Sequence, residues 1–204
     1  SSVPEFVKQL SNQYQQNIAQ QLIAQGFYEI YNNSLTTPKH SGSIDEMVEI
    51  LNPLSSELSV MRTNLLYGML EAVQFNNNRQ QQNLRFFEVG NTYHKTKKGT
   101  IQTPTLGVVV TGQQLPNHWS VTTQKSDFFF LKGVVKTLLQ RLGVHANEFP
   151  GKHAHYKEAI DFHCKDNYIG TLGLVNLGAF EGVNIDQDVF ACTLKLDTVL
   201  ANTN

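Results

Sequence analysis

The chain has 204 residues with 16 basic and 17 acidic side chains, so its net charge at pH 7 is −1. A nearly neutral chain has no general electrostatic attraction for nucleic acids or membranes. The two cysteines, Cys164 and Cys192, have no metal-binding or redox spacing, which favours a reducing, cytoplasmic setting. No apolar run approaches the roughly 18 residues of a membrane span.

The first predicted element is a long amphipathic helix over about residues 4–25, which Gly26 ends. Apolar residues recur every three or four positions and form one stripe. The stripe comprises Val7, Leu10, Tyr14, Ile18 and Leu22. A stripe of this kind packs on a partner helix or covers the sheet of its own chain, and the pattern alone does not decide between the two.

The remaining pattern predicts two more helices among short strands. The helices are expected at about residues 64–79 and 127–142. The strands are expected at about residues 27–35, 47–51, 58–61, 84–93, 106–111, 144–149, 158–164, 168–175 and 188–196. Hairpins dominate this order and no series of βαβ crossovers occurs, which predicts a single α+β domain over residues 1–204. Its sheet is expected to be antiparallel, with the helices on one side.

Few residues have the spacing of a catalytic or metal site. The sequence contains no P-loop, dinucleotide-binding loop or nucleophile elbow. Four residues would approach a common metal ion if two strands paired: His153, His155, His163 and Cys164. Lysines surround them, however, and no carboxylate completes a ligand set with convincing spacing. We therefore predict ordinary surface histidines and no metal site.

Charged residues cluster in the middle of the chain. One group lies around apolar segments, and there buried charges need partners: Glu57, Arg62, Arg79, Arg85 and Glu88. This group is either a charge-paired structural frame or a set of arginines that captures phosphate or carboxylate. A second group forms a basic turn: Lys95, Lys97 and Lys98. Such a turn is usually a solvated loop, and the alternative is a contact with RNA.

Several of these segments resemble the β subunit of bacterial phenylalanyl-tRNA synthetase. The most specific stretch reads LNPLSSE at 51–57, MRT at 61–63, LLYGML at 65–70 and LRFFEVG at 84–90. Weaker matches follow in the same order, with DFF at 127–129, LKG at 131–133 and GTLG at 170–173. The resemblance extends over essentially the whole chain.

The resemblance implies a class II aminoacyl-tRNA synthetase-like antiparallel sheet flanked by helices. It also implies that the first helix and the following strand form the dimerisation motif, so the stripe from Val7 to Leu22 would lie at a subunit interface. Residues 85–88, RFFE, echo the second class II motif, whose arginine holds the ATP α-phosphate. No arginine follows Arg141, so the arginine of the third motif is absent. We therefore expect no catalytic residue in this chain.

The implied function is that of a non-catalytic scaffold. It would pack on the catalytic α subunit in an α2β2 heterotetramer and support ATP-dependent attachment of phenylalanine to tRNA-Phe. ATP and magnesium are expected for the holoenzyme and no cofactor for this chain. Because the family's β subunit is much longer, the chain is expected to be a fragment. Two alternatives stay open: a free-standing amino-acid-activating enzyme and an accessory tRNA-binding module.

Overall fold

The computed structural model describes residues 5–40, 44–53, 55–114 and 124–203. The strands are β1 Tyr28–Glu29, β2 Leu35–Thr36, β3 Val60–Met61, β4 Leu84–Thr96, β5 Gly99–Thr111, β6 Asn147–Gly151, β7 Tyr156–Cys164, β8 Asn167–Val175 and β9 Val189–Lys195. Seven of them form one sheet in the order β1-β4-β5-β9-β8-β7-β6, and β2 pairs with β3 separately. All pairs are antiparallel except β1 with β4. Both β1 and β6 are therefore edge strands.

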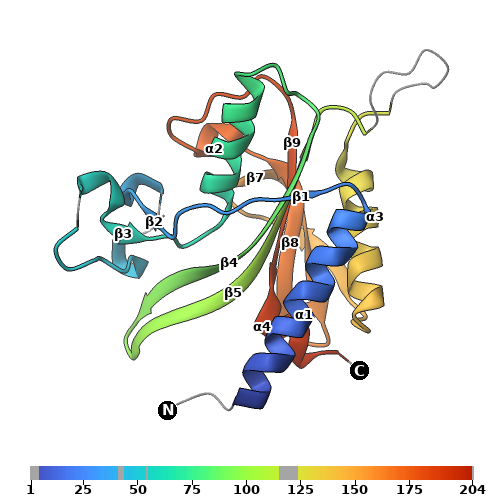
Figure 1. The fold of residues 1–204 in the computed structure, drawn as a ribbon, viewed down its shortest axis with the longest axis horizontal. Coiled ribbons are helices and arrows are strands. Elements are labelled where there is room, and N and C mark those ends of the chain that lie inside the picture. The colour runs from blue at the N-terminus through green and yellow to red at the C-terminus, as the bar shows by residue number, and fades with distance from the viewer. Residues whose placement is uncertain (1–4, 41–43, 54, 115–123, 204) are drawn as a thin grey trace.

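Helices cover both faces of this sheet (Figure 1). They are α1 Glu5–Ala24, α2 Leu66–Asn77, α3 Phe128–Arg141 and α4 Leu196–Ala201, with short 3-10 turns at Pro38–His40, Ile44–Glu46, Ser56–Leu58 and Leu177–Ala179. In β5, Val108 and Val110 pack in a core with α1, α3 and α4, whereas Val109 packs in a second core with α2. The expectation that the helices lie on one side is therefore wrong for α2. Among the described residues, no helix combines the length and apolarity needed to cross a membrane.

Local sequence signals explain where the long helices begin and end. The Asp127 carboxylate accepts a hydrogen bond from the Phe130 backbone N–H at 2.8 Å and caps the start of α3. Gly26 and Gly143 follow α1 and α3 with φ values of 82° and 74°. In both places the backbone bonds are those of a Schellman motif, which favours glycine because of the positive φ.

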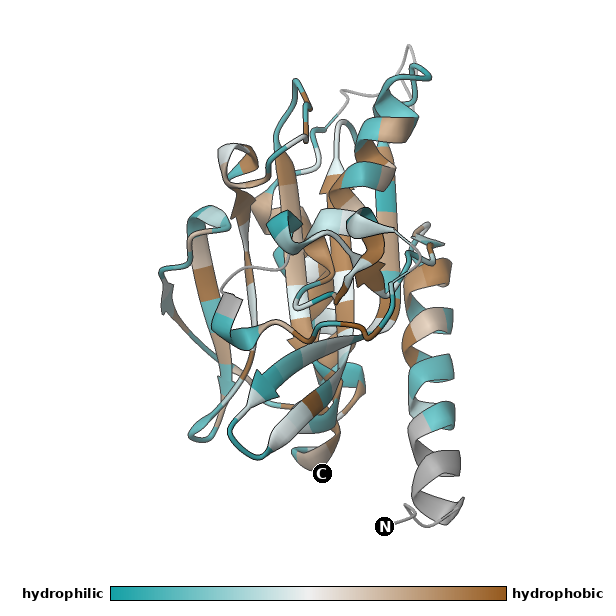
Figure 2. Cartoon of the chain, turned by 90° about the vertical axis from the view of Figure 1, so that its left-hand side faces the viewer, coloured by the Kyte–Doolittle hydropathy of each residue, from teal (hydrophilic) through white to brown (hydrophobic). Residues whose placement is uncertain are grey.

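The chain departs from the predicted strands in the region before α2. The strand expected over 27–35 is confined to β1, because the following residues leave the sheet and form the projecting segment that contains β2 and β3 (Figure 1). The strand expected over 47–51 is reduced to an isolated bridge between Glu49 and Val60. Figure 2 shows that apolar residues concentrate in the central strands.

Candidate functional site

A buried ion pair joins the projecting segment to the sheet. The Arg62 Nη1 atom lies 2.6 Å from Glu88 Oε1, and the two residues are only 7% and 2% exposed. Arg62 Nε also donates to the Asn91 carbonyl at 3.0 Å, and Asn32 Nδ2 donates to Glu88 Oε2 at 2.6 Å. Because both charges have several partners, their burial is tolerated. Arg62 is therefore committed to the structure and is not available to capture phosphate.

The remaining members of the charge group lie elsewhere. Arg85 donates to the carbonyls of Gln25 and Gln114, and its guanidinium lies 4.9 Å from the centre of the Phe130 ring. Burial lowers the pKa of Arg85 from its ordinary value. Arg79 stacks on its helix neighbour Phe75 at 3.5 Å. Of the five charges predicted as one frame, only Arg62 and Glu88 contact each other.

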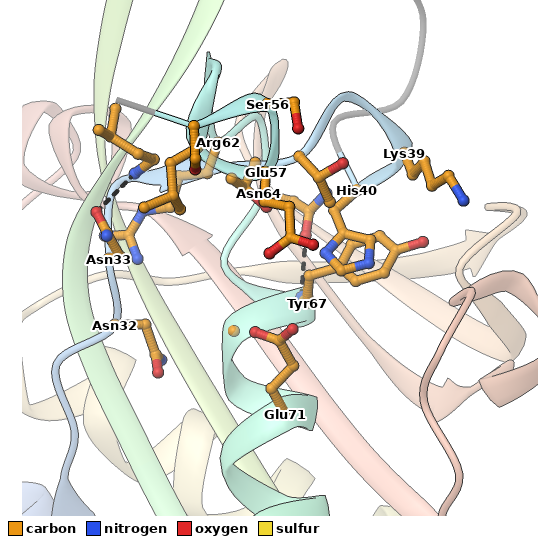
Figure 3. Close-up of a pocket in the computed structure, with 16 residues that line it drawn as sticks. Asn32, Asn33, Lys39, His40, Ser56, Glu57, Arg62, Asn64, Tyr67 and Glu71 are labelled. Atoms are coloured by element: carbon orange, nitrogen blue, oxygen red, sulfur yellow. Dashed lines mark hydrogen bonds between the residues drawn. The ribbon is translucent and has the colours of Figure 1, made fainter. Parts of the chain in front are cut away.

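Glu57, the fifth member, lines a pocket beside α2 (Figure 3). The pocket has a volume of about 760 Å³ and lies between residues 32–40, residues 55–58 and the first turns of α2. His40 stacks on Tyr67 in its wall, with ring centroids 3.9 Å apart. The Glu57 and Glu71 side chains point into the pocket (Figure 3), and neither has a basic partner in the described part of the chain.

The charges of this pocket disfavour a nucleotide. Its two strong cations are already paired, Arg62 with Glu88 and Lys39 with Glu181 at 2.8 Å. The unpaired charges are the carboxylates of Glu57 and Glu71, which would repel a polyphosphate. The pocket therefore lacks the arginine clamp that phosphoryl chemistry needs.

A second pocket, of about 730 Å³, lies on the sheet face that α1 and α3 leave uncovered. Its wall contains a hydrogen-bonded network that the sequence did not reveal. Asp161 Oδ1 lies 2.7 Å from His153 Nε2 and accepts from Thr171 Oγ1 at 2.6 Å, and the Tyr168 hydroxyl lies 2.7 Å from Thr171 Oγ1. Lys195 Nζ lies 5.2 Å from the centre of the Tyr168 ring. Threonines and histidines line much of the remainder, and no arginine is present.

The three histidines of the predicted surface group do not converge. His153 pairs with Asp161, whereas His155 packs on Phe180 with ring centroids 4.9 Å apart. Burial and the neighbouring His153 lower the pKa of His155. His163 contacts the rings of Phe149 and Tyr168. Across the described ranges, no three His, Cys, Asp or Glu side chains are arranged to hold a metal ion.

The described part of the α1 apolar stripe packs on the chain itself. Ile18 and Leu22 are fully buried in the core of the chain itself, which is the second of the two arrangements that the sequence left open. Tyr14 packs beside them, and burial raises the pKa of its hydroxyl to about 12. The side chains of Val7 and Leu10 lie outside the described residues.

Beside the buried part of α1, three large apolar side chains face solvent. Ile23 is 54% exposed at the end of α1, Tyr28 is 73% exposed in β1, and Tyr31 is 80% exposed just beyond it. Because β1 is an edge strand, this apolar group lies at one border of the sheet. We refer to Ile23, Tyr28 and Tyr31 as the β1 edge patch. The sequence pattern did not single out this patch, although aromatic residues within a predicted strand are a visible signal.

A solved structure shares the fold of this chain. A pyrrolysyl-tRNA synthetase from Desulfitobacterium hafniense superposes with a TM-score of 0.69 at 15% sequence identity, over 92% of this chain and 66% of that protein. The antiparallel sheet flanked by helices is therefore the class II aminoacyl-tRNA synthetase fold, as predicted.

Sequence comparison identifies the family. The model of the phenylalanyl-tRNA synthetase β-chain CLM domain matches residues 3–196, and the chain belongs to this family. Phenylalanine–tRNA ligase β subunits of Bacteroides thetaiotaomicron and Porphyromonas gingivalis are each 32% identical, over 91% and 93% of this chain. The β subunit of Mannheimia succiniciproducens is 35% identical over 87% of it. The chain covers 25%, 25% and 24% of these three relatives.

Proposed function

We propose that this chain is a non-catalytic assembly module of a phenylalanine–tRNA ligase β subunit. It packs on the catalytic α subunit, within an α2β2 heterotetramer that acts in the cytoplasm. There it supports the ATP- and magnesium-dependent attachment of phenylalanine to tRNA-Phe. Membership of the family supports a role in this enzyme. The observation that carries the assembly role is the exposed β1 edge patch. Exposed tyrosines support an interface because tyrosine is enriched where proteins meet.

The charged residues support a non-catalytic role. Arg85, the residue that echoes the second class II motif, is bound to two backbone carbonyls and lines neither of the two pockets described above. Arg62 is neutralised by Glu88, and no arginine follows Arg141 in the sequence. No arginine is therefore placed to stabilise the charge that develops on the α-phosphate of ATP when an adenylyl group is transferred and pyrophosphate leaves.

The first prediction tests the interface. Replacing Tyr28 and Tyr31 together by serine is expected to weaken binding to the purified α subunit by roughly 30-fold or more, since a single aromatic hot-spot residue contributes about 2 kcal/mol or more. Binding is measured by isothermal titration calorimetry, and circular dichroism checks the fold.

The matched control is Phe149→Ser. Phe149 is also an exposed aromatic residue, at 50%, but it belongs to β6 at the opposite edge of the sheet. This variant should bind the α subunit like the unchanged chain. If the Tyr28 and Tyr31 variant binds normally, or the unchanged chain does not bind at all, the assembly proposal is wrong.

A further inference from the structure

Acidic and basic residues are distributed unevenly along this chain. Between Glu88 and Asp127 the sequence contains no acidic residue, and it carries four lysines there, three of them at Lys95, Lys97 and Lys98. The chain as a whole has a net charge of −1. The rest of the molecule is therefore negative on balance, and positive charge is concentrated on the segment that contains β4 and β5.

The fold presents this charge away from the body of the molecule. Strands β4 and β5 pair along their whole length, and the distal half of their hairpin extends beyond the remaining strands (Figure 1). Residues 95–100 are all exposed. The lysines form no ion pair with a carboxylate in the described part of the chain. Their charges are thus available to an external partner.

The tip is ordered rather than a long flexible loop. Lys97 and Lys98 form a two-residue turn between paired strands. Thr96 Oγ1 donates to the Gly99 carbonyl at 2.8 Å and accepts from the Lys98 N–H at 3.3 Å. Gly99 has φ of 124°, a conformation that glycine adopts without strain. The cations are therefore held close together on a narrow ribbon, so binding requires little ordering of the backbone.

We propose that the tip of the β4–β5 hairpin binds the phosphodiester backbone of RNA, and that tRNA is its partner when the chain is part of the ligase. This proposal rests on the proposed function for the identity of the RNA. The contact is electrostatic and independent of sequence, because lysine acts as a point charge towards phosphate and the tip carries no aromatic side chain for stacking. A narrow projecting ribbon fits the groove or the backbone of a folded RNA better than it fits a flat surface of another protein.

The test compares two variants that lose equal charge in the assembled ligase. In the tip variant, Lys95, Lys97 and Lys98 become glutamine. In the control variant, Lys152, Lys157 and Lys165 become glutamine, and these three lysines are also exposed but lie around β7. The affinity for tRNA is measured by fluorescence anisotropy at several salt concentrations. The association of each variant with the α subunit is measured in parallel.

The tip variant should bind tRNA roughly 10- to 100-fold more weakly near 0.1 M salt. Its slope of log affinity against log salt should be shallower by about 0.7–0.9 for each lost phosphate contact. The control variant should keep the slope of the unchanged enzyme. An unchanged slope in the tip variant would overturn the proposal, as would equal losses in both variants. Weaker subunit association with unchanged tRNA affinity would instead assign the tip to a protein contact.

Failure of the proposed function gives a different result. If the unchanged chain does not associate with the α subunit, the assembly role is wrong. The hairpin contact is then measured with the chain alone and tRNA, by the same salt titration and the same two variants. A salt-dependent affinity that only the tip variant loses would still support the RNA contact, and the absence of any such affinity would overturn it.

Discussion

At the scale of single residues, the buried ion pair of Arg62 and Glu88 is important for the stability of the chain. Glu88→Gln keeps the shape of the side chain but leaves the Arg62 charge without its carboxylate partner. Removing one partner of a buried pair typically costs about 3–5 kcal/mol of unfolding free energy. We therefore expect Glu88→Gln to have a clearly lower midpoint of urea unfolding, measured by circular dichroism.

The exposed ion pair between Lys39 and Glu181 provides the control for this prediction. Both of its side chains are 66% exposed, so water solvates the charges whether or not they are paired. Glu181→Gln should leave the urea midpoint unchanged. Equal effects of Glu88→Gln and Glu181→Gln would show that the buried pair is not important for stability.

The sequence predicted the contacts of single residues only in part. It recognised that Arg62 and Glu88 need partners, but their contact depends on the docking of the projecting segment against β4, which no local pattern encodes. It also found no carboxylate with convincing spacing to complete a metal-ligand set with the histidines. Asp161 lies two residues before His163 on a predicted strand, so both side chains share one face of that strand. Alternation would have placed this carboxylate near the histidines.

At the scale of elements, helix α3 contains a glycine that packing does not require. Gly133 is exposed, and an added Cβ would meet no atom within 4 Å. Glycine inside a helix costs roughly 0.5–1 kcal/mol relative to alanine. Gly133→Ala should therefore raise the unfolding free energy by about that amount, measured from the urea midpoint.

Gly170 in β8 should respond in the opposite direction. There an added Cβ would lie 2.2 Å from the Thr193 carbonyl oxygen of the neighbouring strand, and this backbone atom cannot move without disturbing the sheet. Gly170→Ala should lower stability. If both alanine variants shift the midpoint in the same direction, the packing argument fails.

Apolar patterning accounts for which elements the sequence predicted well. The helices α1 and α3 and the glycines that end them lie as expected. Residues 94–96 and 99–105 of the β4–β5 hairpin were not predicted as strand, because most of them are polar and not buried, and backbone pairing alone extends the strands there. The apolar run at 106–111 already indicated a strand buried on both faces. It contradicted the expectation that the helices cover only one side.

At the scale of the whole molecule, the fold keeps the sheet of a class II synthetase while its charged groups serve structure. Arg85 links the end of α1 to the residues after β5, and Arg62 links the projecting segment to β4. The pocket beside α2 has unpaired carboxylates where a nucleotide would require cations. Because of these three features, the chain has the fold of a class II synthetase but lacks the cations that activation of an amino acid requires.

The final prediction concerns the catalytic activity of the chain by itself. The chain alone should show no phenylalanine-dependent exchange between ATP and pyrophosphate, because it has no arginine placed to stabilise the charge on the α-phosphate during adenylyl transfer. The same assay on the α subunit with this chain bound should show exchange if the chain supports assembly. Cooperative urea unfolding of the isolated chain establishes that it is folded in the assay. Exchange by the folded chain alone, removed when Arg85 is changed to alanine, would make it a free-standing amino-acid-activating enzyme.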